Sequence, residues 1–163
     1  MSFYTDFIQK SPLFNNPAEC RDQSMLEPGF GAAVKAIIAE AAAMGITLMV
    51  TETFRSQARQ QQLFRQGATQ LNGLTPATIG VHHFGLAADF CKIIDGKASW
   101  AGDWSFLRDL ADKHGLVSGV DWGQPNVKHS FIDPDHVQGC TVAQQSLLFA
   151  GTWYPGPPVT NVS

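Results

Sequence analysis

The chain has 163 residues, with 11 Lys and Arg against 14 Asp and Glu, which gives a formal net charge of −3 at pH 7. A chain of this length can bury enough surface to fold as one domain without disulfide bonds. Its 44% of hydrophobic residues and 15% of charged residues exclude a disordered chain and a coiled coil. Because no cluster of Lys and Arg adds a positive field, nucleic acid and anionic membranes are not expected as partners.

No run of apolar residues is long enough to span a membrane, since the longest, from Val34 to Val50, is interrupted by polar residues and glycine. The first residues include an acid, Asp6, and lack the basic start and apolar centre of a secretory signal. We therefore expect a protein that is made in the cytoplasm. Its three cysteines lie far apart and are expected to be buried thiols: Cys20, Cys91 and Cys140.

The first half of the chain predicts a helix, a strand and a second helix. Apolar residues recur at helical spacing from Pro28 to Gly45, where glycine ends the helix. Polar and apolar residues then alternate from 46 to 54, which predicts a strand that leads to Arg55. Ser56 is expected to cap a second helix that ends at Gly67, and residues 67–80 have the composition of a loop.

The second half predicts a hairpin and two further helices. Residues 84–94 have strand character, and the following Asp95-Gly96 pair is typical of a type I′ turn. Asp103 is expected to cap a helix that ends at Gly115, and a short last helix covers residues 141–150. Helices and strands thus mix without the regular alternation of a parallel sheet.

The predicted fold class is α+β, a compact single domain with a small antiparallel sheet and flanking helices. We expect this domain to cover residues 1–153. A Pro/Gly-rich tail, residues 154–163, is expected to be poorly ordered. The protein is expected to be a monomer.

All five histidines lie between positions 82 and 136. One pattern, H-x-x-G-x-A-x-D, runs from His82 to Asp89, and its Gly and Ala leave space around an acid on an otherwise apolar strand. Such a carboxylate needs a partner, and a divalent cation is the strongest one. A second pattern, D-x-x-H, runs from Asp133 to His136, where Pro134 favours a turn or strand end.

One histidine and the aspartate of the first pattern, with the histidine of the second, provide three metal ligands and leave a fourth position open. This arrangement is typical of catalytic zinc, which lowers the pKa of water to about 7. Asp133 would then be the general base, and Arg55 would stabilise a substrate carboxylate or the developing oxyanion. Each motif alone has a simpler explanation, namely a hydrogen-bonded structural histidine or an arginine paired with an acid at a helix start.

Together these motifs resemble the VanY-like D-alanyl-D-alanine carboxypeptidases and L-alanyl-D-glutamate endopeptidases, zinc peptidases of bacterial cell-wall peptide that include short phage endolysins. The resemblance covers residues 26–138 and implies a fold of the Hedgehog/DD-peptidase type. It implies one Zn²⁺ per chain, held by His82, Asp89 and His136. It also implies that Asp133 is the catalytic base and that Arg55 steadies the substrate and the transition state.

Several assignments stay open within this resemblance. Asp135 competes with Asp133 for the role of base, because family members frequently have proline at position 135. His83 is an alternative ligand, although the spacing to Gly85 favours His82. His114, at a helix end, is expected to contact the helix's last carbonyl groups. The residues considered for substrate binding are Gln60, His129, Asp121 and Trp122.

The resemblance implies a zinc peptidase that cuts the stem peptides of peptidoglycan. An L-Ala–D-Glu endopeptidase is favoured over a D,D- or L,D-carboxypeptidase. The alternative is a non-catalytic module of a phage or secretion apparatus that binds wall peptide or a metal. The enzyme would reach the cell wall or periplasm through a holin, a secretion system or lysis, and the sequence identifies neither a delivery partner nor an immunity partner.

Overall fold

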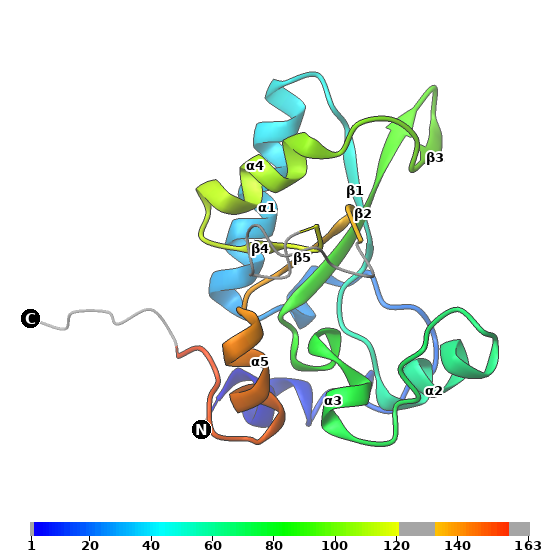
Figure 1. The fold of residues 1–163 in the computed structure, drawn as a ribbon, viewed down its shortest axis with the longest axis vertical. Helices are drawn as coiled ribbons and strands as arrows, with labels where there is room; N and C mark the ends of the chain where they lie inside the picture. The colour runs from blue at the N-terminus through cyan, green and yellow to red at the C-terminus, as the bar shows by residue number, and fades with distance from the viewer. Residues whose placement is uncertain (1, 121–132, 157–163) are drawn as a thin grey trace, which may run out of the picture.

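The computed structural model describes residues 2–120 and 133–156 (Figure 1). The helices are α1 (Pro28–Ala43), α2 (Gln57–Arg65), α3 (Pro76–Ile79), α4 (Ser105–Lys113) and α5 (Val142–Phe149), with a π-helical turn η1 (Tyr4–Ile8) and the 3₁₀ turns η2 (Gln23–Met25) and η3 (Val81–Phe84). The strands are β1 (Leu48–Glu52), β2 (Ala87–Ile94), β3 (Lys97–Ser99), β4 (Val117–Ser118) and β5 (His136–Gln138). None of the helices in these ranges has the length and apolar character needed to cross a bilayer.

Local capping signals explain where the longer helices begin. The Glu27 carboxylate accepts the Gly29 and Phe30 N–H groups at the start of α1. The Ser56 hydroxyl accepts the N–H group of Arg59 at the start of α2, as predicted. Thr141 caps α5 through a capping box, so this predicted helix is also confirmed.

Three local predictions are wrong. The expected loop at 67–80 contains the one-turn helix α3, which Thr75 caps. Strand β2 begins at Ala87 rather than at residue 84, because the 3₁₀ turn η3 ends at Gly85, which has a left-handed φ of 72°. The N-cap of α4 is Trp104 rather than Asp103, although the Asp103 carboxylate still accepts the Ser105 N–H group at 2.8 Å.

The sheet is antiparallel, with the order β1-β2-β5-β4, and β3 pairs with the far end of β2. Asp95 and Gly96 have φ values of 50° and 75°, which confirms the predicted β2–β3 turn. The register places Asp89 on β2 opposite Glu52 on β1 and opposite His136 on β5. The predicted α+β class with a small antiparallel sheet is therefore confirmed.

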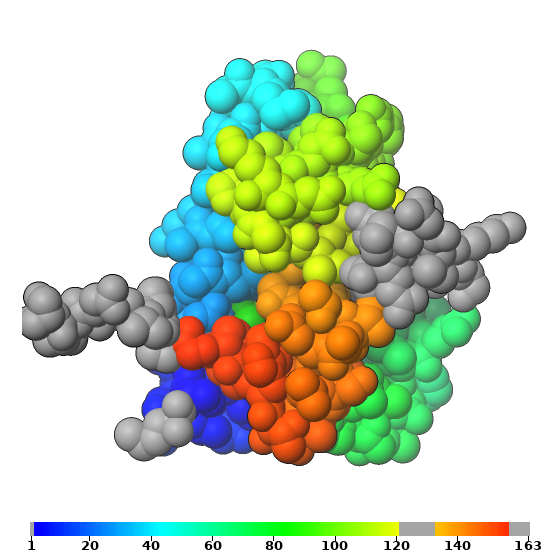
Figure 2. Space-filling model, turned by 60° about the vertical axis from the view of Figure 1, so that its left-hand side comes forward, coloured from blue at the N-terminus to red at the C-terminus, as the bar shows by residue number. Residues whose placement is uncertain are grey.

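Helices α1 and α4 pack together beside the sheet (Figure 1). Figure 2 shows α5 and its flanking residues, in orange and red, beside the green surface of the α2–α3 region. The main core includes Phe30, Ile37, Phe90, Leu107 and Val137.

Tyr154, the first residue of the expected tail, contacts the domain. Its hydroxyl donates a hydrogen bond to the carbonyl oxygen of Phe84 at 2.7 Å, and its ring packs against the main core. Burial raises the pKa of the Tyr154 hydroxyl far above its ordinary value. Tyr154 is therefore packed on the domain.

We predict that Gly85→Ala lowers the free energy of unfolding by about 2–4 kcal/mol. An added Cβ would meet the Met25 carbonyl oxygen at 2.6 Å and would also force a left-handed φ on alanine. The matched control is Gly96→Ala, which has a similar φ with no atom within 4 Å of the new Cβ and should cost about 1 kcal/mol. Urea unfolding followed by circular dichroism compares the two variants, and equal costs would contradict the packing argument.

Candidate active site

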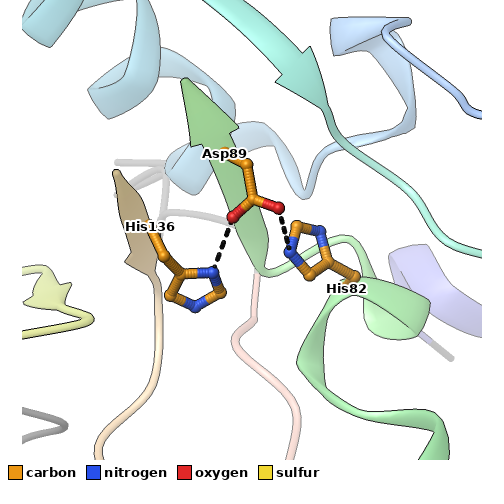
Figure 3. A group of neighbouring side chains, drawn as sticks. All are labelled: His82, Asp89 and His136. Atoms are coloured by element: carbon orange, nitrogen blue, oxygen red, sulfur yellow. Dashed lines mark hydrogen bonds and ion pairs between the residues drawn. The ribbon is translucent and has the colours of Figure 1, made fainter. Parts of the chain in front are cut away.

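Three side chains from separate segments meet at one point (Figure 3). His82 lies on η3, Asp89 on β2 and His136 at the start of β5. The Nε2 atom of His82 lies 3.2 Å from one Asp89 carboxylate oxygen, and Nδ1 of His136 lies 2.9 Å from the other. One ligand atom from each side chain lies within 4.8 Å of the other two.

The backbone explains why these segments converge. Gly85 reverses the chain between η3 and β2, so His82 returns toward Asp89 on the strand. A tight turn leads into β5, with the N–H group of His136 donating to the Asp133 carbonyl oxygen at 3.2 Å. The carbonyl oxygen of Asp135 accepts the Phe90 N–H group at 3.0 Å, which ties this turn to β2.

The hydrogen bonds on the far side of each imidazole fix its tautomer. Nδ1 of His82 lies 2.7 Å from the Thr53 carbonyl oxygen, which can only accept, so this ring nitrogen carries the proton. Nε2 of His136 lies 3.0 Å from the Gln138 amide oxygen, and the Gln138 amide nitrogen donates to the Cys140 carbonyl oxygen. In the neutral rings, the nitrogens that face Asp89 are therefore unprotonated.

This arrangement suits a cation. Two imidazole lone pairs and a carboxylate point at one another, and acceptors of this kind attract each other only through a shared proton or metal ion. Burial disfavours the Asp89 carboxylate, but the two imidazoles outweigh burial and hold the pKa of Asp89 well below its ordinary value. Burial also opposes protonation of His136, but the Asp89 carboxylate outweighs it and raises the pKa of His136. Two nitrogens and one carboxylate oxygen are a ligand set typical of zinc.

Arg55 lies beside this group and is held by two residues of its own neighbourhood. Its Nε donates to Glu52 Oε1 at 2.6 Å and its Nη1 donates to Gln60 Oε1 at 3.0 Å. Its Nη2 also pairs with Glu52 and lies 3.7 Å from an Asp89 oxygen. The second oxygen of Glu52 accepts Nε of Arg59 at 3.2 Å. The sequence analysis missed Glu52 and Arg59, although an acid three residues before Arg55 and a basic residue four after it were a usable signal.

Gln60 lies behind Arg55, in the interior of the protein. Its side chain is fully buried, and its amide nitrogen donates to the Leu71 carbonyl oxygen at 2.8 Å. Its amide oxygen holds Arg55. In this structure Gln60 orients Arg55, and its predicted contact with substrate stays a prediction.

The two candidate bases differ in their access to the site. The Asp133 side chain belongs to the wall of the cavity described below, whereas Asp135 is absent from that wall. Burial and the neighbouring Asp133 raise the pKa of Asp135 to about 8. Carboxylate oxygens of both residues approach those of Asp89 within 4.8 Å.

The remaining histidines that the structure describes point elsewhere. Nδ1 of His83 donates to the Arg55 carbonyl oxygen and its Nε2 accepts from the Tyr4 hydroxyl at 3.0 Å, so this ring faces away from Asp89. Burial lowers the pKa of His83. The backbone N–H group of His114 donates to the Leu110 and Ala111 carbonyl oxygens at the end of α4, as expected, and its Nε2 lies 3.2 Å from the Glu40 carboxylate on α1. The expected substrate residues Asp121, Trp122 and His129 lie outside the described residues.

A cavity of about 510 Å³ joins these groups. This volume lies in the range of small-molecule and peptide sites. Its charged end is lined by Glu52, Arg55, Arg59, His82, Asp89, Asp133 and His136. Its less polar end is lined by residues of α2, α3 and α5, including Leu63, Ala77, Ile79 and Phe149.

No family model matches this sequence. It is 34% identical over 101 residues to the peptidoglycan L-alanyl-D-glutamate endopeptidase CwlK of Bacillus subtilis, an alignment that covers 53% of this chain. The chain spans only 60% of the length of that relative.

Solved structures show the same fold. The L-Ala D-Glu endopeptidase ChiX of Serratia marcescens has a TM-score of 0.51 and 21% identity, with 77% of this chain and 93% of ChiX covered. VanYB, in complex with D-alanine-D-alanine, has a TM-score of 0.52 and 16% identity, with 77% of each chain covered. The resemblance to VanY-like peptidoglycan peptidases is thereby confirmed.

We predict that His82→Ala abolishes stoichiometric zinc uptake, because it removes one of the three converging ligand atoms. His83→Asn is the matched control and should retain one zinc ion per chain, since the His83 ring faces Tyr4 and Arg55. Elemental analysis of the two purified variants after zinc loading and desalting makes the comparison. If His82→Ala retained zinc and His83→Asn lost it, the ligand would be His83 and not His82.

Proposed function

We propose that this chain, a relative of the VanY-like peptidoglycan peptidases, is a zinc-dependent peptidase that hydrolyses peptidoglycan stem peptides. The favoured reaction is cleavage of the L-Ala–D-Glu bond. The observation that carries the proposal is the convergence of two tautomerically fixed imidazoles on one carboxylate, within a cavity that also holds an acid and an arginine. The endopeptidase activity named for CwlK and ChiX supports the choice of bond.

His82, Asp89 and His136 are the proposed ligands of one Zn²⁺ per chain. When bound, the ion would supply Lewis acidity, which lowers the pKa of water to about 7 and polarises a carbonyl group. Thr53 and Gln138 keep the far ring nitrogens protonated, so that the near nitrogens remain available as ligands.

The protein's own groups perform the remaining steps. Asp133 is proposed to take the proton from the attacking water and to pass it to the departing amine. Arg55 is proposed to stabilise the negative charge that develops on the carbonyl oxygen, and it needs no reorientation because Glu52 and Gln60 already hold it. Asp135 serves this scheme less well, since it does not line the cavity.

A non-catalytic binding module is the alternative function. An acid at the cavity wall beside the candidate ligands favours an enzyme over a binder, because binding alone has no use for a proton acceptor there. The proposed site of action is the cell wall, reached as a monomer through a holin, a secretion system or lysis.

Purified peptidoglycan tests the function directly. We expect the protein to release peptides that begin with D-glutamate, identified by mass spectrometry, while the L-alanine remains on the glycan. Treatment with a chelator should abolish release, and added Zn²⁺ should restore it. Fragments shortened only at their carboxyl end would indicate a carboxypeptidase, and the absence of any release would reject the enzyme.

We predict that Asp133→Asn lowers kcat by at least about 100-fold with bound zinc unchanged, because a general base contributes on this scale. The matched control is Asp135→Asn, which changes the same kind of group two residues away and should retain most activity. Rates of fragment release from purified peptidoglycan, with metal content measured on the same samples, compare the two. A larger loss of activity in Asp135→Asn than in Asp133→Asn would identify Asp135 as the base.

A further inference from the structure

The two arginines of the cavity differ in how many of their nitrogens are occupied. All three guanidinium nitrogens of Arg55 have protein partners, namely Glu52, Gln60 and the more distant Asp89. Toward the described residues, the Arg59 guanidinium makes one hydrogen bond, from Nε to Glu52 at 3.2 Å. Within residues 2–120 and 133–156, its Nη1 and Nη2 groups have no hydrogen-bond partner. Arg59 is therefore the arginine with donors left for a ligand.

Arg59 is also held in place before any ligand arrives. The Ser56 cap fixes the first turn of α2, which carries Arg59. Glu52 is only 4% exposed and fixes the near side of the guanidinium. Because the Arg59 side chain is 19% exposed and lines the cavity, its remaining donors are partly desolvated yet accessible. A ligand would lose little entropy in ordering this side chain.

The charges around Arg59 favour an anion. One buried carboxylate, Glu52, lies between two guanidinium groups, and the next carboxylate, Asp89, lies 3.7 Å from Arg55. Among the described residues, Arg59 therefore shares its one carboxylate partner with Arg55. Two parallel N–H groups on a planar guanidinium match the geometry of a carboxylate. A carboxylate-containing ligand is therefore the class that this position would bind best.

The position of Arg59 indicates which carboxylate of the substrate it would bind. Asp89, Arg55, Glu52 and Arg59 follow one another across the cavity wall, so that Arg59 is separated from the candidate zinc ligands by the Arg55–Glu52 pair. If the scissile carbonyl group lies at Arg55, as proposed above, a group on the adjacent substrate residue would lie in this region. In a stem peptide, D-glutamate continues the chain through its side-chain carboxyl and leaves its α-carboxyl free.

We propose that Arg59 binds the free carboxylate of the residue that follows the scissile amide. This inference rests on the proposed peptidase function and assigns a specificity determinant to it. Arg55 then acts on the reacting carbonyl group, and Arg59 selects the substrate by its charge.

Two synthetic stem peptides test this assignment. They differ in one group, because the α-carboxyl of the D-glutamyl residue is free in one and amidated in the other. Calorimetric titration of zinc-loaded Asp133→Asn protein measures binding of both peptides, and the wild type gives kcat/KM. The free acid should be preferred by about 10- to 100-fold, as expected for a charge-assisted hydrogen-bonded pair.

We introduce Arg59→Gln both into the wild type and into the Asp133→Asn protein. The substitution should reduce the preference to less than about 3-fold, mainly because the free-acid peptide binds more weakly. The matched control is Arg65→Gln, which removes an exposed arginine of the same helix and should leave the preference unchanged. Because the readout is a ratio within one preparation, a partly unfolded variant does not mimic the result. Arg59→Lys should keep part of the preference, since it retains the charge without the fork.

The outcomes separate this inference from the proposed function. The inference is overturned if the preference for the free acid survives in Arg59→Gln. It is also overturned if protein that retains Arg59 binds the two peptides equally. Charge-selective binding that depends on Arg59, without cleavage by the wild type, supports the inference and rejects the peptidase. Failure of both peptides to bind overturns the inference as well.

Discussion

The site depends on the pairing of β2 with two other strands. Asp89 lies opposite Glu52 on β1 and opposite His136 on β5, so a single residue of the central strand connects the arginine pair to the imidazole pair. A shift of one residue in either ladder would turn Asp89 to the other face of the sheet. The irregular register between Val50 and Glu52 lies beside this point. The positions of the charged groups therefore follow from the sheet and not from the loops alone.

A buried carboxylate, Glu52, and a partly buried one, Asp89, lie opposite each other on paired strands, and each needs compensation for its lost hydration. Glu52 obtains it from two arginines, which satisfy both of its oxygens. Asp89 has two imidazoles and a more distant guanidinium. Neutral imidazoles do not balance its charge, and this is why Asp89 is suited to a metal ion while Glu52 is not. The difference in partners separates a structural acid from a ligand.

Local signals in the sequence predicted much of this structure. Helix caps such as Ser56 and the H-x-x-G-x-A-x-D pattern act over a few residues, and Gly85 fixes the turn that the pattern needs. Tertiary contacts were not predictable in the same way. Glu40 binds a histidine 74 residues later, and Tyr154 reaches a carbonyl group 70 residues earlier. No residue next to these partners in the sequence indicates either contact. The buried position of Gln60 depends on how the loop that follows α2 folds back over it.

The arginine and the histidines of the site are fixed to each other through their backbones. The N–H group of Arg55 donates to the His82 carbonyl oxygen, the His82 ring donates to the Thr53 carbonyl oxygen, and the His83 ring donates to the Arg55 carbonyl oxygen. The Tyr4 hydroxyl donates to the far side of the His83 ring, so the N-terminal turn reinforces this link from outside the region of family resemblance. A site held in this way reorganises little when charge develops in it, which is the property that electrostatic catalysis requires. His83, which competed with His82 as a ligand in the sequence, thus contributes by fixing the loop that carries Arg55.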